Sequence, residues 1–143
     1  MAWEHDIRNG TAVGKYFVHI ETARIKYFEA MVAIGKELDP AFDADGFIHG
    51  RAVGPILAST SCKFIRPCTY PDTLHTFVSA KLLDDDRFAM DYTMFSDEAG
   101  WDVPVAKGEG VVVTVDYAAA VPARCPVPAV LRDAIGRLTA AEA

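Results

Sequence analysis

The stretch KYFVHIETARIKYFEAM, which runs from Lys15 to Met31, decides the fold class. Its apolar residues recur at helical spacing, and they predict an α-helix from about Gly14 to Ile34. At 100° per residue the apolar side chains cover most of the cylinder and leave only a narrow polar stripe. Such a helix is expected to be enclosed by other elements. Glu21 and Arg24 nevertheless fall inside the apolar sector, which raises the question of what they do there.

After the loop that follows this helix, the apolar residues change to the two-residue period of β-strands. Residues 2–8 are predicted as a short strand, Gly35 as the C-cap of the helix, and KELDPAFDADGF as a polar, mobile loop. The remaining elements are strands over about 47–53, 57–66, 74–83, 87–95 and 105–117, and a short amphipathic helix over about 129–138.

This order of elements predicts an α+β fold in a single domain covering residues 1–143. One short strand and one apolar helix are followed by consecutive strands. A strongly curved, mainly antiparallel sheet wrapped around the central helix would enclose that helix. Such a sheet leaves an exposed edge, and we therefore expect the chain to dimerise through edge pairing.

Composition narrows the class of protein. Hydrophobic residues make up 51% of the chain and the formal net charge is -6. A nucleic-acid-binding protein normally carries a basic face, so that class is disfavoured. No segment reaches the length of a membrane span, and the opening residues have neither the basic nor the apolar region of a signal peptide. We therefore expect a cytoplasmic protein without membrane partners.

The three cysteines and four histidines show no metal-ligand spacing, so no metal and no other cofactor is expected.

Several stretches resemble a known family. YFVHIETARIKYF is similar to the helix signature of the hotdog-fold acyl-CoA thioesterases, the group that includes 4-hydroxybenzoyl-CoA thioesterase. STSCKFIRPCTYPDTL, VAKGEGVVVTVD and VPARCPVPAVLRDAI resemble that family's Arg-Pro strand, last strand and C-terminal helix. The resemblance covers about residues 3–137. It implies a hotdog fold, hydrolysis of an acyl-CoA thioester, and a homodimer or homotetramer.

The resemblance also implies where the catalytic acid lies. The family carries an Asp-x-Asp-x-x-Gly-His-x-Asn-Asn loop before the helix. Counting back from Tyr16 without a gap places Glu4 and Asp6 on the two acidic positions, and Asp6 inherits the catalytic one. The loop's histidine and asparagines are missing, and Ala12 and Val13 stand where the asparagines would be.

Thioester hydrolysis needs a carboxylate that attacks the carbonyl carbon or activates water, and donors that stabilise the oxyanion. The N–H groups at a helix N-terminus suit the second task. The resemblance places the carbonyl-polarising amide near Val13, with Gly14 beside it. Asp6 is the preferred base or nucleophile. Glu21 is the alternative, because a related hotdog group uses an acidic residue on this helix. The other interpretation of Glu21 and Arg24, three residues apart, is structural: an ion pair between them, or a link from the helix to the sheet or to another subunit.

Four residues are candidates for substrate binding. Tyr16 and Phe17 are expected beside the acyl chain. Lys63 and Arg66 could meet a coenzyme A phosphate, although a regular strand would place them on opposite faces, and ordinary surface charge is the other interpretation.

Two further functions stay open. One is a hotdog module that binds acyl-CoA without turnover, which the missing histidine and asparagines favour. The other is a dehydratase or hydratase, against which the lack of a recognisable hydratase loop counts.

Overall fold

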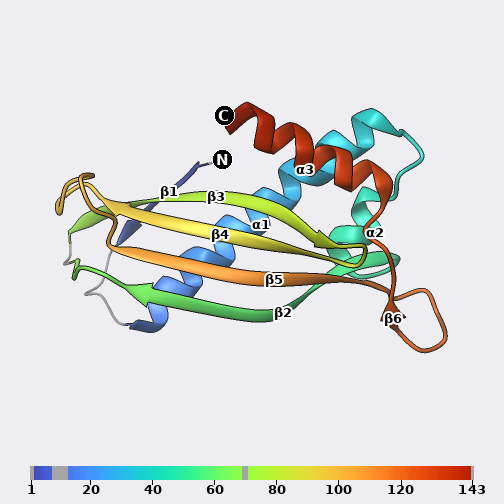
Figure 1. Cartoon of the computed structure of the whole chain (residues 1–143), viewed down its shortest axis with the longest axis horizontal. Helices are drawn as coiled ribbons and strands as arrows, with labels where there is room; N and C mark the ends of the chain where they lie inside the picture. The colour runs from blue at the N-terminus through green and yellow to red at the C-terminus, as the bar shows by residue number, and fades with distance from the viewer. Residues whose placement is uncertain (1, 8–12, 69–70, 143) are drawn as a thin grey trace.

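The fold is a curved antiparallel sheet laid across one long helix (Figure 1). The computed structural model describes residues 2–7, 13–68 and 71–142, with side chains placed for 16–68 and 71–141. The described helices are α1 (Val13–Leu38) and α2 (Ala44–His49), which follow the first strand, and α3 (Ala129–Glu142), which follows the last. The strands are β1 (Ala2–Ile7), β2 (Val53–Phe64), β3 (Asp72–Asp84), β4 (Arg87–Ser96), β5 (Ala106–Asp116) and β6 (Ala123–Arg124).

Strand order in the sheet is β1-β3-β4-β5-β2, and every neighbouring pair is antiparallel. The two-residue β6 pairs with the last residues of β5, beyond Val113, where the pairing of β5 with β4 ends. Among the described residues, β2 therefore forms one edge of the sheet and β1 the other. These observations confirm the predicted α+β hotdog architecture, in which the sheet wraps around a central helix.

One face of the sheet packs on α1 and forms the core. Alternate residues of β3, β4 and β5 point inward, as the two-residue period predicts. They meet a buried stripe of α1, and the largest completely buried side chains of this layer are Ile20, Tyr27, Met31, Leu74, Phe88, Met90 and Tyr92. α3 closes the core at one end by packing Leu131 and Ala134 against α1. None of the described helices is long and apolar enough to cross a bilayer.

The predicted strand over 47–53 is wrong, because that segment holds α2. The Asp43 side chain caps this helix by accepting from the Gly46 amide at 2.9 Å. Gly50 ends it in the left-handed conformation, with φ at 66°. The segment expected to be a polar, mobile loop therefore contains a capped turn of helix, and the strand begins only at Val53.

Gly35 is not the C-cap of α1, which continues to Leu38. Its role is close packing. A Cβ added at Gly35 would lie 3.1 Å from Leu131 Cδ2 and 3.4 Å from a carbon of the Phe42 ring. A side chain here would therefore push α3 and the segment after α1 away from the helix.

Enclosure of α1 is only partial in the single chain. Four residues on one side of the helix, which we name the open stripe, face solvent: Phe17, Val18, Glu21 and Ile25. Three of the four are large and apolar. Exposed apolar residues also stand at the two ends of β2, with Ile56 and Leu57 near one end, and Phe64 and the following Ile65 at the other.

Candidate active site

The first turn of α1 lies at the end of the sheet where β1 and β2 finish (Figure 1). Asp6 is the second-last residue of β1 and pairs with Thr73, while Ile7 pairs with Asp72. α1 begins at Val13, as the proposed amide site requires. In any α-helix the first four N–H groups have no partner within the helix. The backbone of Asp6 and these amides therefore share one end of the fold. The side chains of Glu4, His5 and Asp6, and the whole of residues 8–12, lie outside the described part.

The Tyr16 side chain is buried beneath this first turn. Its hydroxyl lies 2.8 Å from Cys68 Sγ, and its ring meets the Phe64 ring edge-on with centroids 5.0 Å apart. Burial raises the pKa of the Tyr16 phenol, and the hydrogen bond with Cys68 raises it further. Tyr16 is thus a neutral part of the core, whereas Phe17 on the open stripe is the aromatic side chain of this turn that solvent reaches.

The Tyr16 phenol should make stability fall at high pH. Its pKa is raised in the folded state, so the unfolded chain releases the phenolic proton first, from about pH 10 upward. The contribution of the neutral phenol to the free energy of unfolding is fully present below that pH. Above it, the free energy of unfolding falls by up to about 1.4 kcal/mol per pH unit. Urea unfolding between pH 9 and 11.5 should show a shallower decline in Tyr16→Phe than in the unchanged protein. Identical slopes would contradict this assignment.

A buried carboxylate, Asp72, anchors the same end of the sheet. It accepts hydrogen bonds from the Thr73 amide at 2.7 Å, from the Glu98 amide at 3.2 Å and from the Ser96 hydroxyl. Through these three hydrogen bonds Asp72 links the start of β3 to the end of β4 and the turn that follows it. Asp72 lies within the stretch STSCKFIRPCTYPDTL that carries the family resemblance, but the sequence alone did not identify this anchoring role.

Arg24 answers the question raised by the polar residues of α1. Its guanidinium donates a hydrogen bond to the Tyr92 hydroxyl, which in turn points to Met90 Sδ at 3.5 Å. Burial raises the pKa of the Tyr92 phenol, and Arg24 opposes part of that rise. For Arg24 the predicted link from helix to sheet is confirmed, because it reaches the inner face of β4. Among residues 16–68 and 71–141 no ion pair joins Glu21 to Arg24, and Glu21 is exposed on the open stripe.

Glu21 stands two turns along α1 from the first amides. At 1.5 Å per residue, eight residues separate it from Val13 by about 12 Å along the helix axis. That separation is too long for Glu21 to act on a carbonyl held by the Val13 or Gly14 amide of the same chain. Within one chain, the end of β1 is the nearer source of a carboxylate.

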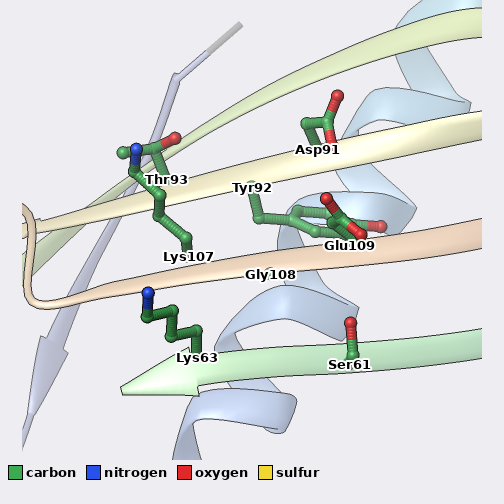
Figure 2. A pocket seen from close by; sticks show the side chains of 8 residues that line it. All are labelled: Ser61, Lys63, Asp91, Tyr92, Thr93, Lys107, Gly108 and Glu109. Atoms are coloured by element: carbon green, nitrogen blue, oxygen red, sulfur yellow. The ribbon is translucent and has the colours of Figure 1, made fainter. Parts of the chain in front are cut away.

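The structure does not bring Lys63 and Arg66 together. The Arg66 guanidinium holds the loop between β4 and β5: Nη1 donates to the Ala99 carbonyl at 3.1 Å, and Nη2 donates to the Gly100 carbonyl at 2.9 Å and to the Val103 carbonyl. Lys63 projects from the outer face of the sheet, away from α1 (Figure 2). A phosphate would have to compete with three carbonyls for Arg66, so the phosphate role stays a prediction with no support from this geometry.

Removing the Arg66 guanidinium should loosen the loop over residues 97–104. Arg66→Ala leaves the carbonyls of the loop without their donors, and we expect a loss of about 1–3 kcal/mol in the free energy of unfolding. Arg66→Lys should recover little, because one ammonium cannot reproduce the fork. Hydrogen exchange of this loop is the direct measurement, with the exposed Arg137→Ala as control. Unchanged exchange in Arg66→Ala would contradict the role.

The outer face of the sheet carries a shallow hollow of about 470 Å³ (Figure 2). It lies on the opposite side of the sheet from α1. It is therefore separate from the first turn of that helix. Within the described residues, no group of three His, Cys, Asp or Glu side chains is arranged to hold a metal ion.

Solved structures that share this fold include several thioesterases. A variant of 4-hydroxybenzoyl-CoA thioesterase in complex with 4-hydroxybenzoyl-CoA matches with a TM-score of 0.74 and 14% identity, over 94% of this chain and 97% of the other. A 1,4-dihydroxy-2-naphthoyl-CoA thioesterase from Synechocystis matches with a TM-score of 0.72 and 14% identity, over 97% and 98%. A thioesterase from Thermus thermophilus, complexed with coenzyme A and zinc, matches with a TM-score of 0.71 and 19% identity, over 97% and 93%.

At these identities the structures establish the shared fold. No curated protein sequence matches the chain. The family model of the thioesterase-like superfamily, in contrast, matches residues 2–135, which is nearly the whole length. The hotdog architecture and this match agree, and the chain therefore belongs to the thioesterase-like superfamily.

Proposed function

We propose that the protein hydrolyses an acyl-CoA or aroyl-CoA thioester to the free acid and coenzyme A. The observation that carries this proposal is the placement of Asp6 near the end of β1, at the same end of the fold as the first turn of α1. A carboxylate and a set of helix N-terminal amides are the two parts that thioester hydrolysis needs. The superfamily match and the CoA-thioesterase neighbours support the same reaction.

The proposed reaction uses backbone donors and one acid. The thioester carbonyl oxygen accepts from the N–H groups of Val13 and Gly14, so negative charge developing on it meets the positive end of α1. Asp6 either takes a proton from the attacking water or attacks the carbonyl carbon itself. When Asp6 acts as the base, water adds to the carbonyl carbon, the C–S bond breaks and the free acid leaves. When Asp6 attacks, its oxygen forms a mixed anhydride as the C–S bond breaks, and water then hydrolyses this anhydride to the free acid and the Asp6 carboxylate. In both cases the coenzyme A thiolate takes up a proton. Backbone amides survive any side-chain change, so this scheme needs neither the histidine nor the asparagines of the family loop.

The proposed active form is a dimer. Among the described strands β2 has no neighbour on its outer side, so that edge offers unpaired backbone groups. The first turn of α1 reaches the end of β2, where the Tyr16 and Phe64 rings meet, and the exposed open stripe follows along the helix. Pairing two β2 edges would cover the apolar residues at the strand ends and bring two open stripes together. The acyl chain would then lie beside Phe17, between α1 and the second copy. A homotetramer would join two such dimers.

A thioesterase assay tests the proposal. Purified protein is given a panel of aromatic and aliphatic acyl-CoAs, and released thiol is followed with a chromogenic disulfide. The named substrates of two neighbours are aroyl-CoAs, so 4-hydroxybenzoyl-CoA and 1,4-dihydroxy-2-naphthoyl-CoA belong in the panel. The proposal expects saturable release for at least one member. Absence of release across the panel would count against it.

An acyl-CoA-binding module is the second candidate. The observation that favours it is the loss of the family loop's histidine and asparagines. Calorimetry with the same panel separates the two functions. Tight binding without thiol release would establish the module, whereas release at a rate that Asp6→Asn abolishes would establish the enzyme.

A further inference from the structure

Arg24 is a half-buried cation whose one described partner is neutral. Its guanidinium donates to the Tyr92 hydroxyl. Among residues 16–68 and 71–141, no ion pair joins Arg24 to a carboxylate. A guanidinium carries five N–H donors, and withdrawing a charge from water without an opposite charge is costly. The position therefore favours an anion that the described chain does not supply.

Arg24 lies on the same side of α1 as Phe17, the residue beside which the acyl chain is proposed to lie. The two positions are two helical turns apart and differ by only about 20° around the helix axis. An acyl group that passes Phe17 and continues along α1 therefore reaches Arg24. Lys26 stands on the opposite side of the helix, about 200° away from Arg24, and pairs with Glu29 at 3.5 Å.

The inner face of the sheet is sparsely filled beside the Tyr92 hydroxyl. Gly110 on β5 pairs with Met90 on β4 and with Thr60 on β2. It has no side chain, and a Cβ added there would lie 3.9 Å from Tyr92 Cε2 and 3.4 Å from Leu57 Cδ1. Thr60, at the edge of the sheet, is exposed. The surroundings of the guanidinium thus combine a polar hydroxyl with a position that has no side chain.

We propose that Arg24 binds a carboxylate at the far end of the acyl group, so that the substrates are acyl-CoAs with a distal acid. This inference rests on the proposed thioesterase function and specifies its substrate class. A planar guanidinium forms two parallel hydrogen bonds with a carboxylate, which suits the donors that Tyr92 leaves open. Arg24 would then be a specificity-determining residue and would take no part in the chemical step.

The helix sets the length of the acyl group. Arg24 lies about 15 Å along the axis from the Gly14 amide that is proposed to hold the carbonyl oxygen. Helical side chains lean towards the N-terminus, so the Arg24 side chain shortens the distance to be spanned to about 10 Å. An extended chain advances about 1.2 Å per bond, so about seven to eight bonds fill this distance. A suberyl group has this length, whereas a succinyl group is too short.

The alternative partner of Arg24 is Glu21 of a second copy, because the proposed dimer brings two open stripes together. Glu21 is exposed, so water and salt screen its repulsion of an acyl carboxylate. Arg24 is half-buried and acts at hydrogen-bond distance. The phosphates of coenzyme A lie on the other side of the thioester from the acyl chain, so they do not compete for Arg24 in the proposed pose.

Paired substrates of equal length test the proposal. The measured quantity is the ratio of kcat/KM for suberyl-CoA to kcat/KM for octanoyl-CoA. Arg24→Gln keeps a donor for the Tyr92 hydroxyl but removes the charge, and it should lower this ratio about 10–100-fold. Arg24→Lys keeps the charge and should retain part of the preference. The ratio for succinyl-CoA over butyryl-CoA should be the same in Arg24→Gln and the unchanged protein, because a succinyl group does not reach Arg24.

Two further variants and three outcomes complete the test. Lys26→Gln removes a cation from the opposite side of α1 and should leave both ratios unchanged, and Glu21→Gln should not lower the suberyl ratio. A suberyl ratio that Arg24→Gln does not change would overturn the proposal, and so would an equal fall in both ratios. If Arg24→Gln and Glu21→Gln each lower the mass of the assembly and neither changes the suberyl ratio, Arg24 pairs with Glu21 of a second copy instead.

Calorimetry separates this inference from the proposed function. Absence of thiol release from every acyl-CoA would count against the enzyme, and the dissociation constants of suberyl-CoA and octanoyl-CoA would then replace the kinetic ratio. Tighter binding of suberyl-CoA that Arg24→Gln abolishes would support the role of Arg24 in a binding module. Equal binding of the two, or a preference that survives in Arg24→Gln, would overturn it.

Discussion

Replacing Asp6 by asparagine should lower kcat for acyl-CoA hydrolysis about 10²–10⁴-fold. An amide is neutral, so it can neither take a proton from water at neutral pH nor attack the thioester carbon. The first-turn amides of α1 remain, so KM should change much less than kcat. The measurement is steady-state thiol release from the best substrate of the panel. Thermal unfolding of the same sample verifies that the variant is folded.

Two matched substitutions serve as controls for Asp6→Asn. Glu4→Gln removes the neighbouring acid of β1, and Glu21→Gln removes the acid of the open stripe. Both should keep kcat within a few-fold of the unchanged protein. If Glu21→Gln alone abolishes turnover while Asp6→Asn is active, the working carboxylate lies on α1, and the proposed role of Asp6 is wrong.

Adding one methyl group at Gly108 should destabilise the fold by about 1–3 kcal/mol. A Cβ at this position would lie 2.7 Å from Ile20 Cδ1, 3.3 Å from the Ser61 carbonyl oxygen and 3.4 Å from Tyr92 Cδ2. Ile20 is completely buried and cannot move away without disturbing the contact between α1 and β5. Urea unfolding of Gly108→Ala measures the effect.

The control for Gly108→Ala is the same change at Gly136. A Cβ at Gly136 meets nothing within 4 Å, and the residue lies within α3. Gly136→Ala should therefore stabilise the protein, by about 0.5–1 kcal/mol. Shortening the crowded side chain with Ile20→Val should cost less in the Gly108→Ala background than in the unchanged protein. Equal costs in both backgrounds would show that Ile20 is not what the new methyl group meets.

The spacing of apolar residues predicted those helices and strands that bury only one face. The buried stripe of α1 and the alternating faces of β3, β4 and β5 follow from apolar spacing, because each packs one face on the core. α2 was missed for a physical reason. This short helix depends on the Asp43 cap and on the left-handed conformation of Gly50, and neither feature changes the apolar period. The expected strand at 47–53 followed that period and was wrong.

The site was less predictable than the fold, because its contacts join residues far apart in the chain. The bond from Arg24 to Tyr92 depends on how α1 lies across β4, which spacing along one element cannot specify. The same holds for Asp72, whose partner Ser96 comes from the next strand. The roles of Asp6, Val13 and Gly14 came from the family resemblance. The structure adds the start of α1 at Val13 and the pairing of Asp6 with Thr73.

The most direct test of the proposed mechanism is a crystal structure of the protein with a non-hydrolysable acyl-CoA analogue. The account predicts that the analogue's carbonyl oxygen lies within about 2.7–3.1 Å of the Val13 or Gly14 amide nitrogen. It also predicts that an Asp6 carboxylate oxygen faces the carbonyl carbon, directly or through one water. An analogue bound elsewhere, or bound at these amides with Asp6 turned into solvent, would contradict the account.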